Sequence, residues 1–492
     1  MNRTRRLVSV DELTDAAEEL LGAGYRLALA AGHDDGRPPL RVVYLFLAGR
    51  PDRRVELECL LPVHDPVLPS MAYMSFPAGR FEREMLDLYG IGLRGHPRPR
   101  RLVRHAHWPD DWHPMRADAP PAPPEFGGSG ELRFLTVGGE GVYEIPVGPV
   151  HAGLIEPGHF RFSVVGETVV RLKARLWYVH RGLERLFHGR SATGATELAE
   201  RVSGDSSAAH ALAHCLAVEE ACGIAVSEPA QRLRALLVEL ERLYNHAADV
   251  GALANDVGFG LANAHALRLR EELLRINAAV NGNRLLRGAI RPGGVTLREL
   301  PDPARLATIT AALAEVTALT LHNGVVYDRF EGTGVLSADD ARALGCLGGP
   351  ARASGLITDA RLDHPVVELP VEEIRGTGGD VLARYTQRRD EFAASVALIT
   401  DIVVNHRGAT EFTAEPGSAP RVGSGVGIVE GWRGTIVHRV EVDDSDRLTR
   451  AKIVDPSWFN WPALPVAMSE TIVPDFPLVN KSFNLSYAGN DL

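Results

Sequence analysis

The sequence predicts an α+β protein, with a small N-terminal α+β domain linked to a large helix-rich domain. Three observations lead to this fold class. Short segments of alternating apolar residues, separated by Gly, Asp and Pro turns, dominate residues 1–120. Residues 121–135 are rich in proline and glycine, which is the composition of a linker. Apolar residues at helical spacing then recur over residues 136–492 and predict a second, mainly helical domain.

The composition is that of a soluble globular protein with room for two or three domains. Hydrophobic residues make up 45% of the 492 positions and charged residues 24%. A net charge of −10 argues against a nucleic-acid partner, which would require a basic balance or stripe. The four cysteines form no Cys-x-x-Cys pair, as is typical of reduced thiols in a cytoplasmic protein. The N-terminus shows no signal-peptide pattern, and the apolar window Ile309–Thr320 is too short for a membrane span.

The N-terminal domain begins with a predicted helix over residues 10–21, for which Asp11 is the expected N-cap. Alternating apolar segments and a second periodic segment follow. They predict strands Tyr25–Ala31, Arg41–Ala48 and Val55–Leu61, and helix Ala78–Tyr89.

The large domain is expected to open with a strand, a turn at Val165–Glu167 and a helix from Val170 to Leu186. Two glycine-rich stretches, Gly376–Gly379 and Gly423–Gly427, do not complete a dinucleotide motif and are predicted as tight turns near a central cavity. The remaining predicted helices are Ala208–Val226, Gln231–Asp256, Leu261–Asn281, Asp302–His322, Asp339–Leu344 and Gly379–Asn405. The remaining predicted strands are Gly427–Glu430 and Ile436–Val442.

A specific string of residues follows Phe81. From Glu82 it reads Glu-Arg-Glu-x-x-Asp-Leu-Tyr-Gly-Ile, and it is followed by Gly-His-Pro and then by Arg100 and Arg101. On spacing alone, this is a charged helix and a basic loop. The string resembles the C-type subunit of the peripheral arm of respiratory complex I. The resemblance implies a docking domain without a cofactor.

The large domain carries four motifs in a fixed order. They are Gly-Pro-x-His-Ala-Gly-x-x-Glu-Pro-Gly-His-Phe-Arg-Phe from Gly148, Tyr-Val-His-Arg-Gly-x-Glu from Tyr178, Glu-Arg-Val-Ser-Gly-Asp-Ser from Glu200, and Asp-Pro-Ser from Asp455. Together they resemble the large subunit of membrane-bound energy-converting [NiFe] hydrogenases of the formate hydrogenlyase type, and the related D-type subunit of complex I. A fusion of C-like and D-like parts is typical of the formate hydrogenlyase-type large subunit.

The resemblance assigns four positions to nickel ligands, and none of them carries cysteine. The family's first Cys-x-x-Cys pair matches Ser203 and Ser206, and the second matches Ser457 and Asn460. A nickel–iron centre needs soft thiolates, which hydroxyl and amide groups do not replace. We therefore expect no [NiFe] centre, no metal and no firmly bound cofactor, with these four positions lining a cavity.

Several proton-handling positions of the family persist. Glu156 matches a glutamate on the family's proton path, His210 a histidine that hydrogen-bonds into the site, and Arg433 the arginine above the metal. Asp205 departs from the hydrogenase pattern and is expected either to carry protons or to cap the helix that follows. We expect these four residues to be the catalytic groups.

A quinone site is matched only in part. In the D-type complex I protein, a loop histidine and a tyrosine reach the quinone head group. His151 occupies the first histidine position of that loop, but the second falls on Ile155 and the tyrosine position falls near Leu198. The resemblance therefore leaves open whether quinone binds.

The residues alone leave simpler alternatives open. His210 and His214 could share a zinc ion, although a hydrogen-bonding histidine beside a packing histidine explains them as well. The serine positions could hold a hard cation or form a hydrogen-bonded polar core. Glu156 could be a buried carboxyl with a raised pKa or a turn residue beside an arginine.

The sequence thus predicts the large subunit of a complex I-like or formate hydrogenlyase-like oxidoreductase that couples electron transfer to proton or ion movement. The expected partners are an iron–sulfur small subunit of the complex I B type, which would carry a [4Fe-4S] cluster, a ferredoxin-like subunit, and antiporter-like and other membrane subunits. The expected location is the cytoplasmic side of the cell membrane, through these partners. The alternatives are a non-catalytic structural or conformational-coupling subunit and an authentic formate hydrogenlyase hydrogenase.

Overall fold

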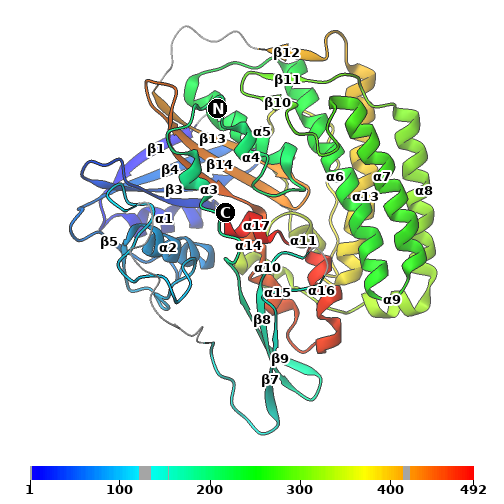
Figure 1. The fold of residues 1–492 in the computed structure, drawn as a ribbon, viewed down its shortest axis with the longest axis horizontal. Coiled ribbons are helices and arrows are strands. Elements are labelled where there is room, and N and C mark those ends of the chain that lie inside the picture. Colours follow the sequence, from blue (N-terminus) through cyan, green and yellow to red (C-terminus); the bar gives the residue numbers. More distant parts are fainter. Residues whose placement is uncertain (1–2, 121–133, 153–154, 414–421) are drawn as a thin grey trace.

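The computed structural model describes residues 3–120, 134–152, 155–413 and 422–492. Its N-terminal part is a four-stranded sheet in the order β1-β4-β3-β2, with β1 parallel to β4 and the other neighbours antiparallel (Figure 1). Helices α1 and α2 pack on this sheet and close its core. The elements of this part are β1 (Arg3–Val8), α1 (Leu13–Gly22), β2 (Arg26–His33), β3 (Leu40–Ala48), β4 (Arg53–Leu61), β5 (Val67–Pro69), α2 (Phe76–Tyr89) and β6 (Gly92–Arg94).

The large part combines a second sheet with a helical bundle. Strands β13 (Gly423–Gly431), β14 (Gly434–Val442) and β15 (Leu448–Val454) form an antiparallel sheet, and α5 (Ser207–Cys222) packs on β13 and β14. The bundle lies on the far side of this sheet from the N-terminal part (Figure 1). It contains α6 (Glu228–Asp256), α7 (Gly260–Asn281), α8 (Pro303–His322), α9 (Gly324–Phe330) and α13 (Val381–Asn405).

Shorter elements connect these layers. A three-stranded sheet projects from the body: β7 (Val142–Val147), β8 (His159–Val165) and β9 (Thr168–Arg175) (Figure 1). The C-terminal helices α14 (Pro456–Asn460), α15 (Ala463–Ala467), α16 (Phe476–Phe483) and α17 (Tyr487–Asp491), together with a short helical turn, η1 (Val473–Asp475), lie near the centre. The remaining elements are α3 (Leu183–Phe187), α4 (Thr196–Ala199), β10 (Ile290–Arg291), β11 (Gly294–Thr296), α10 (Ala338–Leu344), α11 (Gly348–Ala353), α12 (Ala360–Asp363) and β12 (Glu411–Thr413).

The α+β fold class is confirmed, and so are the three N-terminal strands and the helix that follows them. The predicted helix from Val170 to Leu186 is wrong, because Gly166 and Glu167 form a two-residue turn and such a turn joins antiparallel strands. The Asp11 cap is also wrong: α1 starts at Leu13 and its N-cap is Glu12. Most of the predicted linker lies outside the described residues.

The glycines of Gly423–Gly427 lie in strand β13 and not in a turn. A Cβ atom at Gly425 or Gly427 would lie only 1.9 or 1.8 Å from backbone oxygens of α5. Glycine is therefore required here because α5 and β13 approach backbone to backbone.

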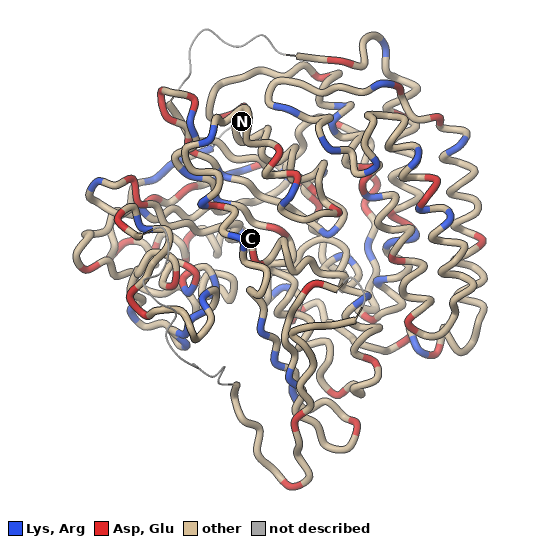
Figure 2. The backbone as a smooth tube through the Cα atoms, viewed as in Figure 1, with Lys and Arg blue, Asp and Glu red and all other residues tan. Residues whose placement is uncertain are grey.

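Among the described residues, α8 alone is long and apolar enough to cross a membrane by length and composition, and a third of it is buried. The sequence had indicated no such segment. Because α8 packs on α7 and α13, burial within a bundle accounts for its apolar face. Figure 2 shows acidic and basic residues interspersed over the bundle and the N-terminal sheet.

Candidate functional site

Three of the four positions matched to nickel ligands meet in one buried cluster of hydroxyl groups, here called the hydroxyl cluster (Ser203, Ser206, Ser457 and Ser486). Ser203 and Ser206 lie in the turn before α5, and Ser457 lies in the first turn of α14. The Ser203 and Ser486 hydroxyls are 2.8 Å apart, and the Ser486 N–H donates to the Ser457 hydroxyl at 2.9 Å. This is the hydrogen-bonded polar core that was one of the alternatives.

Ser486 was missed by sequence reasoning, whereas Asn460 serves a different contact. Ser486 is the N-cap of α17 and accepts a hydrogen bond from the Gly489 N–H at 2.9 Å. The signal that could have found Ser486 is its spacing from Gly489. The two residues are three positions apart, as are Ser203 and Ser206. The Asn460 amide bonds to both backbone groups of Leu347, at 2.9 and 3.0 Å, and so ties α14 to the loop before α11.

Arg433 lies against the hydroxyl cluster in an ion pair with Asp205. Its two terminal nitrogens contact the two carboxylate oxygens of Asp205 at 2.5 and 2.7 Å, and one of them is 3.4 Å from the Ser206 hydroxyl. The guanidinium also lies over the Trp432 ring, 4.0 Å from its centre. Although burial acts to raise the pKa of Asp205, the charge and hydrogen bonds of Arg433 lower it. Asp205 is therefore held as an ionised partner of Arg433, and Ser206, not Asp205, occupies the N-cap position of α5.

A chain of three side chains continues inward from this cluster. One ring nitrogen of His210 is 3.1 Å from the Asp455 carboxylate, and the other is 3.0 Å from the His438 ring. All three are buried, and burial holds the pKa of His438 well below its ordinary value. His214 instead contacts the Ala192 carbonyl oxygen at 3.3 Å, so the two helix histidines have separate partners. Within the described ranges, no three His, Cys, Asp or Glu side chains are grouped to hold a metal.

Glu156 lies at the surface, which favours the alternative of a turn residue beside an arginine over that of a buried carboxyl. Its carboxylate accepts a hydrogen bond of 3.0 Å from the Ala488 N–H in α17, and the Arg181 guanidinium is near enough to attract it. Glu156 is exposed because the loop before β8, to which it belongs, lies on the outer side of α17. His151 closes the same loop through a 2.8 Å contact with the Gly158 carbonyl oxygen.

Glu241 is a second site residue that sequence reasoning missed. Its buried carboxyl accepts the N–H groups of Ala208 and Ala209, at 2.7 and 3.1 Å, at the start of α5. Burial raises the pKa of Glu241 to about 8, and the negative charge of Asp205 contributes to the rise. No motif marked this residue, because its partners lie more than 30 positions away in the sequence.

Replacing Glu241 by Gln is expected to flatten the pH dependence of stability. The folded state binds the Glu241 proton more tightly than the unfolded state, so this contribution is complete below the ordinary pKa of 4.5 and is lost as pH rises through about 8. Its full size is on the order of 5 kcal/mol. Denaturant titrations between pH 5 and pH 9 measure it, with the exposed Glu315→Gln as control. Equal slopes for both variants and the parent would contradict the assignment.

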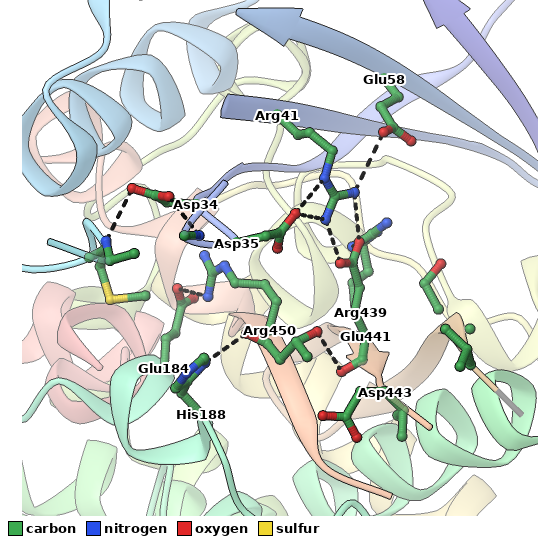
Figure 3. A pocket seen from close by; sticks show the side chains of 18 of the residues that line it. Asp34, Asp35, Arg41, Glu58, Glu184, His188, Arg439, Glu441, Asp443 and Arg450 are labelled. Carbon is green, nitrogen blue, oxygen red and sulfur yellow. Dashed lines mark hydrogen bonds and ion pairs between the residues drawn. The ribbon is translucent and has the colours of Figure 1, made fainter. Parts of the chain in front are cut away.

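The pocket in Figure 3 lies between the N-terminal sheet and strands β14 and β15, with a volume of about 620 Å³. Its charged side chains pair with one another. Arg41 contacts Asp35 at 2.9 Å and Glu441 at 2.7 Å, and Arg450 contacts Glu184 at 2.8 Å. The Arg41–Glu441 pair joins β3 of the N-terminal sheet to β14 of the large part, and none of the pocket's lining residues belongs to the hydroxyl cluster.

Comparison with known proteins decides the family. The model of the respiratory-chain NADH dehydrogenase 30 kDa subunit matches residues 7–125, and that of the 49 kDa subunit matches residues 256–421. The nickel-dependent hydrogenase model matches residues 181–250. Formate hydrogenlyase subunit 5 of Escherichia coli is 32% identical over 89% of this chain and 78% of its own length. The chain belongs to the complex I C/D and hydrogenase large-subunit family.

This C/D-type chain has relatives in respiratory complexes as well. The C/D subunit of the NADH-quinone oxidoreductase of Phocaeicola vulgatus is 32% identical over 69% of this chain and 70% of its own length. Among solved structures, the membrane-bound sulfane sulfur reductase, titled an archaeal respiratory membrane complex, matches with a TM-score of 0.65 at 22% identity. That match covers 72% of this chain and 99% of the other, and it supports the fold. The chain is thus an oxidoreductase-superfamily subunit.

The residues of this C/D-type chain do not fit a nickel–iron centre. The hydroxyl cluster offers neutral oxygens that already bond to one another and to Arg433. The cysteine thiols are no substitute, because burial raises the pKa of Cys59 to about 11 and those of Cys215 and Cys346 to about 12. A thiol with such a pKa stays protonated at neutral pH, and none of these three cysteines belongs to the hydroxyl cluster.

Proposed function

We propose that this chain is the large subunit of a membrane-attached, complex I-like oxidoreductase whose central cluster handles protons without nickel. Family membership supports the class of complex. The observation that carries the rest is the hydrogen-bonded contact of Ser203 with Ser486, at a position matched to nickel thiolates. Mutually bonded hydroxyls beside a buried histidine–carboxylate pair suit proton transfer, whereas they do not suit nickel.

Each site residue has a role in this proposal. Glu156 exchanges protons with solvent or a partner at the outer side of α17, whose N-cap belongs to the hydroxyl cluster. His210 accepts a proton at one ring nitrogen and releases one from the other, with Asp455 fixing its orientation. Arg433 and Asp205 supply a fixed charge pair beside the cluster. Whether quinone or another acceptor is reduced is decided by partner subunits and by the loop that holds His151.

The names of the relatives, which are subunits of respiratory and hydrogenlyase complexes, support a place for this chain in a multisubunit complex. We assign to this chain a small partner of the complex I B type with a [4Fe-4S] cluster, a ferredoxin-like subunit and antiporter-like membrane subunits. These partners attach the chain to the cytoplasmic side of the membrane.

The purified complex is expected to contain only background nickel and to show no hydrogen-dependent dye reduction. Elemental analysis and the dye assay test this, with Escherichia coli formate hydrogenlyase prepared in parallel as the positive control. Stoichiometric nickel together with hydrogen turnover would overturn the proposal and favour an authentic hydrogenase.

The same preparation separates a proton-handling role from a purely structural one. His210→Gln is expected to remove the electron-transfer activity of an intact complex, whereas His214→Gln is expected to retain it, because the hydrogen bond of His214 goes to the Ala192 carbonyl oxygen and not to Asp455. If His210→Gln left activity intact, the chain would be a structural or conformational-coupling subunit.

A further inference from the structure

A second group of charges, here called the charge cluster, lies between α6, α11, α12, α13 and β13. Each member is in direct contact with an opposite charge, and all but the partly exposed Arg361 are buried. The members are Glu239 and Arg242 of α6, Arg352 of α11, Asp359 and Arg361 at α12, Glu391 of α13 and Glu430 of β13. None of them belongs to the hydroxyl cluster or serves in the role assigned to His210.

The charge cluster holds four carboxyl groups but three guanidinium groups. Arg352 contacts Glu430 at 2.7 Å and Glu391 at 2.8 Å. Arg361 contacts Asp359 at 2.6 Å, and Arg242 contacts Glu239 at 3.1 Å. An uncompensated buried charge is costly, so a cluster with one carboxyl in excess is stabilised when it binds one proton.

The surrounding elements do not cancel this excess. Arg26 of β2, which attracts both Glu430 and Asp363, and Arg50, which pairs with Asp363 at 3.2 Å and with Glu373 at 2.9 Å, give two charges of each sign in this surrounding group. His246, 2.9 Å from Glu391, and His364 are buried, and burial lowers the pKa of each, so both are neutral at neutral pH.

Glu430 has the fewest charged partners of the four carboxyls. It accepts hydrogen bonds from Arg352 at 2.7 Å, from the Thr435 hydroxyl at 2.9 Å and from the Ala360 N–H at 3.1 Å. The Thr435 hydroxyl can reverse its role and accept a hydrogen bond from a protonated carboxyl. Burial raises the pKa of Glu430, and the charge of Asp359 raises it further.

The other three carboxyls have stronger partners. Burial acts to raise the pKa of each, but adjacent guanidiniums outweigh it: the pKa of Asp359 falls to about 2, and those of Glu239 and Glu391 also lie below their ordinary value. The excess proton therefore belongs on Glu430.

A cavity leads from Glu430 toward the surface. A space of about 60 Å³ is lined by Glu430 and by the polar side chains of Gln231, Glu239 and Arg361. It shares Gln231, Val366 and Val367 with a surface groove of about 590 Å³. Apolar side chains form most of the remaining lining, so Gln231, Glu239, Arg361 and Glu430 are the partners for ordered water, which can carry protons between the groove and the carboxyl.

We propose that Glu430 is a buried proton-binding site that stays protonated at neutral pH and exchanges with solvent through this cavity. Arg352 and Glu391 link Glu430 to His246, whose ring lies 6.2 Å from that of Trp432, the residue before Arg433. The site thus adds a proton store to the chain at a place distinct from the hydroxyl cluster. The proposal holds whether or not the hydroxyl cluster is free of nickel.

Infrared spectroscopy of the full chain in its complex tests the site. The Glu430→Gln variant is expected to lose one neutral-carboxyl band at pH 7, whereas Glu411→Gln, at an exposed ion pair, is expected to keep it. A Glu430→Gln variant that loses only a carboxylate band would overturn the proposal. Thr435→Val leaves Glu430 in place and is expected to shift the frequency of the same band; an unshifted neutral band would also count against it.

The route is tested by the rate of exchange. After transfer into D₂O, the Glu430 band of the parent protein is expected to shift as deuterium replaces the proton. Val367→Phe, which adds bulk where the cavity and the groove share lining residues, is expected to slow this shift several-fold, whereas Val404→Phe on the exposed face of α13 is expected to leave it unchanged. Equal rates in both variants would rule out the route. This readout does not depend on activity or nickel, so its failure is distinguishable from failure of the proposed function.

Discussion

Replacing Arg234 by Met is expected to lower the free energy of unfolding by about 3–5 kcal/mol. Arg234 is fully buried in α6, where it contacts the Glu219 carboxylate at 2.6 and 3.0 Å and the carbonyl oxygens of Arg291 and Gly294 at 2.7 and 3.0 Å. Methionine fills a similar space but leaves the Glu219 charge buried without a cation. Denaturant unfolding of the parent and variant measures the loss.

The matched control stands two positions earlier on the same helix. Arg232 pairs with Glu228 at 3.0 Å in an exposed i,i+4 contact, so Arg232→Met is expected to cost about 0.3–0.5 kcal/mol. Equal losses for the two variants would contradict this account.

Local sequence patterns correctly predicted the strands that are defined by their own apolar residues and flanking turns. The strands Arg41–Ala48 and Val55–Leu61 were found because they are short, largely apolar segments bounded by Gly, Asp and Pro turns. The segment from Val170 failed for the opposite reason. Its apolar spacing fits both periods, and its state is set by pairing with β8 across a two-residue turn. That pairing is a tertiary choice that a single segment does not encode.

The site residues that belong to a sequence motif could be predicted. Those whose contacts come from distant parts of the chain could not. Ser203, Ser206 and Ser457 were found through motifs, and the structure brings them together. Glu241 and Glu430 carry no motif, and their states depend on partners from other elements. Glu156 carried a motif, but its burial is set by the path of a loop around α17, which spacing does not reveal.

Replacing Gly427 by Ala is expected to destabilise the protein by about 3 kcal/mol, the upper end of the usual range for overpacking. A Cβ atom there would lie 1.8 Å from the Ala213 oxygen, which belongs to the backbone of α5 and cannot rotate away. This clash is removed only if the whole of α5 moves away from β13. His210 lies on the same helix, so its hydrogen bond to Asp455 is expected to weaken as well. Thermal unfolding measures the first effect and the histidine ring signals in NMR the second.

The control is Gly349→Ala in α11, where a Cβ atom would meet no atom within 4 Å. That change is expected to stabilise the protein by about 0.5–1 kcal/mol, because alanine loses less backbone entropy on folding than glycine. The two substitutions add the same methyl group, so opposite signs isolate the close approach of α5 and β13 from any general effect of replacing glycine. If both variants were stabilised, α5 would be able to move away from β13 without loss of stability. His210 would then not depend on that contact for its position beside Asp455.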